Sequence, residues 1–169
     1  MIPISLAFSD HAIDYSNTVS VEGSSEITTA KKDQNITLSA SDDTDVRLQT
    51  IADTQGGVVG AASAEAKNTI NRGNHIHAAA GSMLESTNDV NLYAGADSSG
   101  IQSELGLEVL ADAYNKTVLP VFTKPKVTNT MTQQNQVALG GDVSSVRHIN
   151  ATAGKGVTTV TESAKEYNL

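Results

Sequence analysis

Residues 88–95 read Asn-Asp-Val-Asn-Leu-Tyr-Ala-Gly, and this stretch decides the predicted fold. Aliphatic and polar side chains alternate from Val90 to Ala94, which is the pattern of a β-strand with one buried and one exposed face. The same order of residue types recurs twice: a polar start, then aliphatic, polar and aliphatic residues, then a small residue. The two further copies are residues 33–40 and 147–154. The sequence therefore predicts a strand that repeats along the chain.

Shorter alternating segments lie between these copies, at residues 45–48, 74–78 and 136–139. Asn, Asp, Gly and Ser separate them, and these residue types suit tight turns. Short strands at this spacing predict a sandwich, a barrel or a β-solenoid. Aromatic residues make up only 4% of the chain and tryptophan is absent, whereas sandwich cores of this size normally contain large aromatic side chains.

We therefore expect an all-β protein, and within that class a parallel β-helix (β-solenoid) of several rungs, because Ala, Val and Ile suit a narrow core of stacked ladders. Residues 1–169 are expected to form a single β-helical segment. Residues 60–70 are rich in alanine and fit either two turns of helix or a strand that turns Ala62, Ala64 and Ala66 inward; the strand is preferred.

One part of the chain is expected to leave the regular stack. Residues 114–127 contain two of the three prolines and three of the eleven lysines and arginines. Proline has no N–H to donate to the ladder of a central strand. We therefore predict an irregular, proline-containing loop excursion over residues 112–131.

Composition excludes several classes of function. Eleven basic and nineteen acidic residues give a net charge of −8, which argues against nucleic acid and anionic membrane surfaces as partners. The absence of cysteine rules out disulfides, a thiolate nucleophile and iron–sulfur clusters. The apolar runs are too short for a membrane-spanning helix, and the first residues lack the basic segment of a signal peptide.

Two groups of residues are candidate metal ligands. Asp42, Asp43 and Asp45 place three carboxylates in five residues, and hard cations such as calcium bind several oxygen ligands. The alternative is a solvated acidic turn, because the glycine and distal glutamate of an EF-hand loop are missing. His75 and His77 share one face of a predicted strand. They would need a third ligand, such as His148, to hold zinc or copper, and solvent-facing histidines are the preferred interpretation.

Catalytic motifs are not evident. His11, Asp14 and Ser16 are close in sequence, but no Gly-x-Ser-x-Gly nucleophile elbow occurs. We predict no enzyme, no catalytic residue and no cofactor-binding residue. Threonines at every second position from Thr128 to Thr132 resemble one row of an ice-binding solenoid, although a single row is more typical of an ordinary polar strand.

Three segments carry a resemblance to a known family: residues 111–117, 129–140 and 146–156. They resemble the leukotoxin LktA family of filamentous adhesins. Residues 89–95 also resemble repeats of filamentous haemagglutinin-like large secreted exoproteins. The resemblance covers about the second half of the chain. It implies that residues 1–169 are a fragment of a longer β-helical shaft, and it transfers no catalytic residues.

The expected function is that of a structural shaft segment in a secreted bacterial surface adhesin or exoprotein, which serves adhesion or display at the cell surface or outside the cell. The ligand on a host surface or matrix is unknown. The open ends of a short β-helix present unpaired strands, so self-association is also expected. The alternatives are a carbohydrate-active β-helix enzyme and a self-assembling extracellular fibre subunit.

Overall fold

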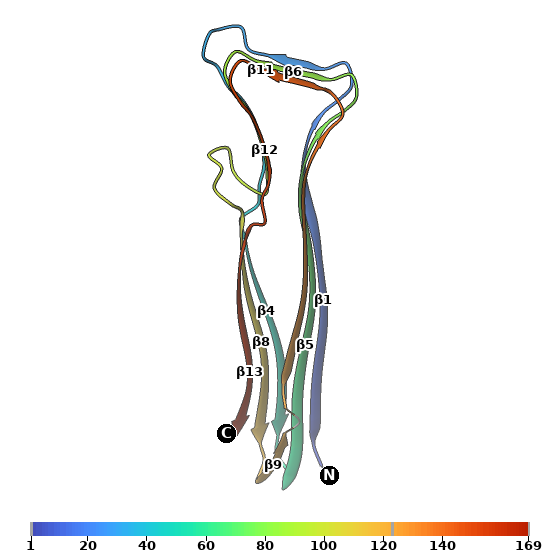
Figure 1. Cartoon of the computed structure of the whole chain (residues 1–169). Coiled ribbons are helices and arrows are strands. Elements are labelled where there is room, and N and C mark those ends of the chain that lie inside the picture. Colours follow the sequence, from blue (N-terminus) through green and yellow to red (C-terminus); the bar gives the residue numbers. More distant parts are fainter. Residues whose placement is uncertain (1, 123, 169) are drawn as a thin grey trace.

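The computed structural model describes residues 2–122 and 124–168, and in these residues the chain consists of strands joined by turns, with no helix (Figure 1). The paired strands that build the sheets are all parallel. This confirms the prediction of an all-β protein with parallel strands. Paired strands are separated in the sequence by roughly one-third of the chain, so the chain follows the same path three times.

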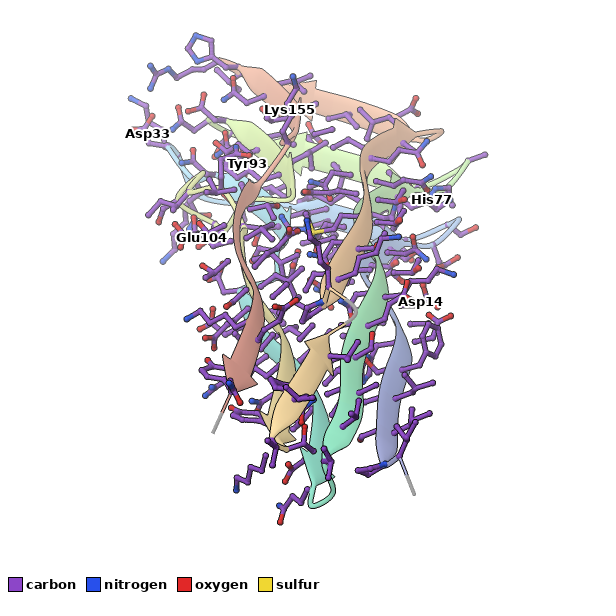
Figure 2. All side chains as sticks on the ribbon, turned by 90° about the horizontal axis from the view of Figure 1, so that it is seen from below. Asp14, Asp33, His77, Tyr93, Glu104 and Lys155 are labelled. Carbon is purple, nitrogen blue, oxygen red and sulfur yellow. The ribbon has the colours of Figure 1, made fainter. Side chains whose placement is uncertain are left out.

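Two long sheets face each other, and both are drawn nearly vertical in Figure 1. One contains β1 (Ile4–Val21), β5 (Val59–Ala78), β10 (Lys126–Leu139) and the short β9 (Leu119–Phe122), which pairs with the start of β5. The other contains β4 (Thr44–Gln55), β8 (Glu104–Lys116) and β13 (Val157–Asn168). Side chains fill the space between the sheets (Figure 2).

Two smaller sheets close the path at one end of the long ones. The first contains β2 (Glu26–Thr28), β6 (Met83–Ser86) and β11 (Asp142–Ser145). The second contains β3 (Ile36–Ala40), β7 (Val90–Ala94) and β12 (Ile149–Ala153). We call each passage through all four sheets a coil: residues 4–55 form the first coil, 59–116 the second and 119–168 the third.

The three repeated stretches of the sequence occupy the same place in successive coils. Val90 of β7 is aligned with Ile36 on one side and with Ile149 on the other. Their side chains face the interior because this register keeps the two-residue alternation of all three strands in phase. The predicted repeat is thus confirmed, and its period is one coil.

The second coil supplies most of the core because it alone has a neighbour on both sides. Its buried apolar side chains are Ala62, Ala64, Ala66, Ile70, Ile76, Ala78, Leu84, Val90, Leu92, Ala94, Ala96, Leu105, Leu107, Val109, Ala111 and Ala113. The first coil adds Val21, Ile36, Ala40 and Ala52, and no apolar side chain described in the third coil is buried to this degree. Small and branched side chains therefore form the predicted narrow core.

Residues 60–70 lie in β5, with Ala62, Ala64 and Ala66 facing inward and almost fully buried. The strand interpretation of this alanine-rich stretch is confirmed. Because the inward side chains of this stretch are small, the two facing sheets can lie close together. A helix at the same place would be too wide for this space.

The excursion predicted at residues 112–131 is wrong in its position. β8 continues to Lys116, β9 spans Leu119–Phe122 and β10 begins at Lys126. Pro120 is accommodated because β9 is a short strand that pairs with β5 alone. The loop that leaves the stack in the second coil instead follows β7, at residues 95–103 (Figure 1). Two glycines with positive φ, Gly95 and Gly100, lie in this loop.

The start of β1 reverses the usual distribution of side chains. Ile4, Leu6 and Phe8 point outward and are 64%, 74% and 65% exposed. The inward positions between them hold Ser5 and Ala7, which are aligned with the small buried residues Ala62 and Ala64 of β5. The outer face of the long sheet thus starts apolar and becomes polar beyond Phe8.

Candidate functional site

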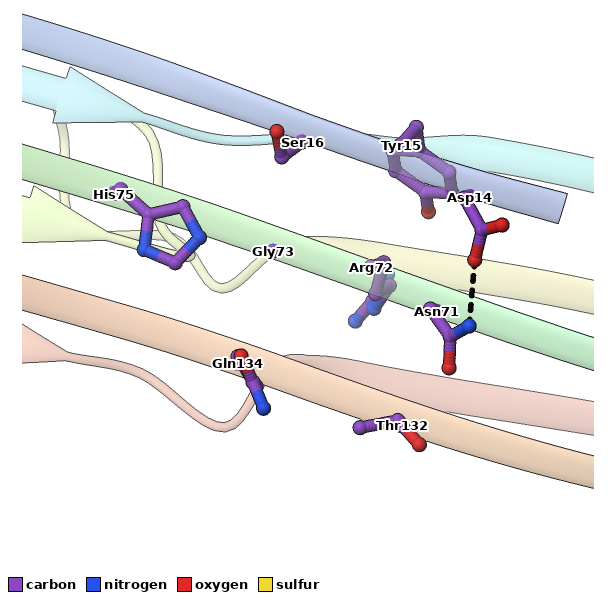
Figure 3. Close-up of a pocket in the computed structure, with 9 residues that line it drawn as sticks. All are labelled: Asp14, Tyr15, Ser16, Asn71, Arg72, Gly73, His75, Thr132 and Gln134. Carbon is purple, nitrogen blue, oxygen red and sulfur yellow. Dashed lines mark hydrogen bonds between the residues drawn. The ribbon is translucent and has the colours of Figure 1, made fainter.

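A hollow of about 480 Å³ lies on the long sheet of β1, β5 and β10, and it is the candidate functional site (Figure 3). Polar residues from all three strands line it. They are Asp14, Tyr15, Ser16, Asn71, Arg72, Gly73, His75, Thr132 and Gln134.

Strand register brings these residues together. Asp14 is aligned with Asn71 and, across β5, with Thr132; the next outward row contains Ser16, Gly73 and Gln134. Parallel strands lie about 4.8 Å apart, so each row presents three neighbouring groups across the sheet. The residues of one row are about 60 positions apart in the sequence, and only the coil period makes them neighbours.

Gly73 leaves room for the His75 imidazole at the edge of the hollow. A Cβ atom at this position would lie 2.7 Å from Nε2 of His75 and 2.9 Å from the backbone oxygen of Gln134. Gly73 is not among the glycines with positive φ, so its backbone conformation does not require glycine. Glycine within a strand lowers stability by about 0.5–1 kcal/mol relative to alanine. The missing side chain therefore has a steric reason at this point of the outer face.

The walls of the hollow lie on either side of Gly73 along the strands. The imidazole of His75 lies on one side, and the pair formed by Asp14 and Asn71 lies on the other (Figure 3). Asn71 Nδ2 donates a hydrogen bond of 2.5 Å to Asp14 Oδ1. This bond holds the carboxylate against the sheet and leaves its other oxygen available as an acceptor.

Directly beneath the hollow, an ion pair lies in the protein interior. Arg72 Nη1 is 3.0 Å from Asp42 Oδ2, and both side chains are nearly inaccessible to solvent. The Tyr15 hydroxyl donates a hydrogen bond of 2.9 Å to the same Asp42 oxygen, and Arg72 Nη2 donates one of 2.9 Å to Gln133 Oε1. Burial raises the pKa of the Tyr15 hydroxyl above its ordinary value, and the hydrogen bond to Asp42 acts in the same direction. The guanidinium is thus used inside the protein and faces away from the hollow.

A ladder of asparagines adjoins this ion pair. Asn17, Asn74 and Asn135 are aligned across the three coils, and the Nδ2 groups of the first two donate to the Oδ1 atoms of the next. Asn74 Nδ2 also donates to Asp42 Oδ1. This network is not predicted from the sequence. The feature of the sequence that corresponds to this network is a pair of polar residues, two positions apart on the inward face of a strand, which recurs once in each coil.

The predicted calcium ligands do not converge. Asp42 faces inward and pairs with Arg72, whereas Asp43 and Asp45 are exposed. Asp43 Oδ1 accepts a hydrogen bond of 2.9 Å from the backbone N–H of Glu104, and the Asp45 carboxylate lies over Gly106. Asp42 and Asp43 lie in the segment before β4, where Asp42 is turned into the interior and Asp43 toward solvent. Within residues 2–122 and 124–168, no group of three or more His, Asp or Glu side chains is placed to hold a metal ion.

The histidines are also apart from one another. His75 and His77 share the outer face of β5, as predicted, whereas His148 precedes β12 in a different sheet. His148 Nδ1 lies 3.1 Å from Asp89 Oδ1. The structure therefore does not bring the suggested third ligand to the histidine pair.

The directions of the side chains decide how two other sequence motifs are interpreted: the group of His11, Asp14 and Ser16, and the row of threonines from Thr128 to Thr132. Along β1, His11 occupies an inward position, whereas Asp14 and Ser16 point outward. Thr128, Thr130 and Thr132 form one outward column on β10, but their aligned neighbours on β5 are Lys67, Thr69 and Asn71. The threonine column is therefore not repeated from coil to coil.

No protein-family model matches the chain, and neither does any curated protein or solved structure. Among the residues that the structure describes, no helix has the length and apolar character needed to cross a membrane.

Proposed function

We propose that this chain is a non-catalytic segment of a β-solenoid shaft in a secreted bacterial surface adhesin, related to the filamentous adhesins that its second half resembles. The stacking of three coils in register, with the second coil enclosed by the other two, carries the proposal. In such an assembly each coil contacts only its neighbours, so stability grows with the number of coils. A repeated unit of this kind suits an extended support better than a compact enzyme.

The two outer coils support this proposal by the apolar surface that they leave uncovered. Ile27 of the first coil is 36% exposed, and Ile149 and Val160 of the third are 48% and 40% exposed. All three occupy inward positions by strand register. A further coil stacked on either end would cover such side chains, as the outer coils cover those of the second.

The spacing and length of the strands determine how many coils a shaft of useful length needs. Two strand spacings advance the stack by only about 10 Å, whereas a strand as long as β5 extends about 65 Å. A shaft that holds a binding region away from a cell therefore needs many more coils than three. This fits the much longer chains of the adhesins that the sequence resembles.

Electron microscopy of the full-length product, purified from the cell that makes it, tests the proposal. We expect a rod many coils long, and antibodies against this chain should label intact cells. A compact particle, or labelling only after the cells are made permeable, would contradict the shaft and its location. Turnover of any member of a panel of acidic and neutral polysaccharides would favour the enzyme instead.

A second test uses the repeat itself. A second copy of residues 56–116, inserted after Lys116, keeps the strand register because Gln55 is aligned with Lys116. We expect the thickness of the particle in small-angle X-ray scattering to grow by about 4.8 Å and the free energy of unfolding to rise. Loss of cooperative unfolding in this variant would contradict a stack of interchangeable coils.

A further inference from the structure

The hollow around Gly73 combines many hydrogen-bonding groups with a lack of cations. Amides from Asn71 and Gln134 and hydroxyls from Ser16 and Thr132 each provide a donor and an acceptor, and Asp14 provides a carboxylate acceptor. No lysine lines the hollow, and the guanidinium of Arg72 is paired inside the protein. The lining therefore offers little to an anionic ligand, for which Arg and Lys are the usual partners.

The geometry points to a binding site for a neutral carbohydrate of one or two sugar rings on the outer face of the long sheet. Sugar hydroxyls both donate and accept hydrogen bonds, and so do the amides and hydroxyls that line the hollow. The Asp14 carboxylate accepts from hydroxyls but repels the carboxylates of acidic sugars. The hollow should therefore select neutral sugars over acidic ones.

The size and shape of the hollow support this class of ligand. Its volume of about 480 Å³ lies within the usual range for small-molecule sites. Gly73 lies between the His75 imidazole and the Asp14–Asn71 pair (Figure 3), and it is buried, with the imidazole close to where a Cβ atom would be. A sugar ring beside the imidazole would contact polar groups on all three strands.

The other mid-strand glycine of an outer face is Gly106 of β8. The Asp45 carboxylate of the neighbouring coil lies close to Gly106, as the His75 imidazole lies close to Gly73. Ser16 and Gln134, which are aligned with Gly73, line the hollow on the neighbouring strands. This inference does not rest on the shaft, because it concerns one face of three strands whatever the length of the whole protein.

Amide NMR spectra of the nitrogen-labelled chain test the inference. The probes are lactose, cellobiose and diacetylchitobiose as neutral sugars, with sialyllactose and digalacturonate as acidic ones. We expect at least one neutral sugar to shift the amide signals of residues 14–16, 71–75 and 132–134, and the acidic sugars to bind at least about tenfold more weakly. No shifts with any neutral sugar, or shifts confined to other residues, would overturn the site. Equal binding of acidic sugars would overturn the selectivity.

A pair of double variants provides the matched control. Asn71→Ala with Gln134→Ala removes two amides of the hollow and should weaken binding about tenfold or more. Thr69→Ala with Thr130→Ala changes two aligned outward residues on the same strands that do not line the hollow, and it should leave binding unchanged. Because all four positions face outward, the amide spectra should show that both variants remain folded. Equal loss in both variants, or none in the first, would overturn the assignment.

Discussion

Asp42 and Arg72 form an ion pair inside the protein that joins two coils and both long sheets. Asp42 precedes β4 in the first coil, Arg72 belongs to β5 in the second, and their side chains are only 5% and 2% exposed. Tyr15, Asn74 and Gln133 supply further hydrogen bonds to the pair. Because burying charges is costly, this pair stabilises the fold only as long as both partners are present.

Removing one partner of this ion pair should therefore lower the stability of the fold strongly. Asp42→Ala leaves the guanidinium of Arg72 buried without a counter-charge, and the free energy of unfolding should fall by about 3–5 kcal/mol. Asp45→Ala, three residues away at an exposed position, should change it by less than about 0.5 kcal/mol. Urea unfolding curves of the two variants provide the measurement. Similar midpoints would show that the interior ion pair does not exist as described.

Alkaline pH should weaken the same region through Tyr15. Its pKa is raised in the folded protein from an ordinary value of 10.0, so the folded state keeps the hydroxyl proton at pH values where the unfolded chain releases it. This contribution to stability is fully present below about pH 10 and is lost as the pH rises through the higher folded value.

Tyr15→Phe removes this titration. Its urea midpoint should fall less steeply between pH 9 and pH 11 than that of the parent chain, as expected from the direction of the Tyr15 shift. Some dependence should remain, because desolvation and then the nearby Asp112 also raise the pKa of Tyr114. Parallel pH profiles for the two proteins would contradict the raised pKa of Tyr15.

The fold could be predicted where inward residues are apolar and outward residues polar. This holds for β3, β7 and β12, whose common pattern identified the repeat. It fails at the start of β1, where Ile4, Leu6 and Phe8 point outward and no strand is predicted. The inward residues there are Ser5 and Ala7, so polarity does not indicate which face of this part of the strand is buried.

The candidate site was predicted only in fragments. From the sequence, Asp14, Ser16 and His75 are candidates for other chemistry, whereas nothing marks Asn71, Gly73 and Gln134 as site residues. These residues become neighbours through strand registers of 57 and 61 residues, which the degenerate repeat of the sequence does not reveal. Asp42, Asp43 and Asp45 are close in sequence, but just before β4 the chain turns Asp42 into the interior and leaves Asp43 exposed.

Charge inside the core should be far more damaging than loss of charge from the surface. Val90 is fully buried in the second coil, so Val90→Asp should lower the free energy of unfolding by about 4 kcal/mol or more. Lys124→Ala, at an exposed position between β9 and β10, should be nearly silent. Thermal unfolding followed by circular dichroism compares the two, and equal melting temperatures would contradict the assignment of Val90 to the core.

The exposed end of the third coil has a feature that should limit its association with other copies. Glu162 and Glu166 occupy inward positions, aligned with Val109 and Ala113 of the second coil. Inward-pointing charges are a known means of protecting an open sheet edge from further pairing. Glu162→Val with Glu166→Ala should therefore make the chain associate at lower concentration.

Sedimentation velocity at several concentrations measures this association. Arg147→Ala, an exposed change outside β13, serves as the control and should leave the sedimentation profile of the parent unchanged. If both variants remain monomeric at every concentration, the open ends do not drive self-association.

Cross-linking between neighbouring coils shows directly whether the three coils stack in register. The chain has no cysteine of its own, so introduced pairs can be studied alone. Thr69→Cys with Thr130→Cys joins aligned residues of β5 and β10, within the Cα separation of about 4.4–6.8 Å that a disulfide requires. Thr69→Cys with Thr132→Cys is displaced by two residues, which places the pair about 7–8 Å apart. Under mild oxidation, we expect an intramolecular disulfide in the first variant and little in the second. Equal cross-linking of both, or cross-linking of the second alone, would contradict the stacking of the coils in this register.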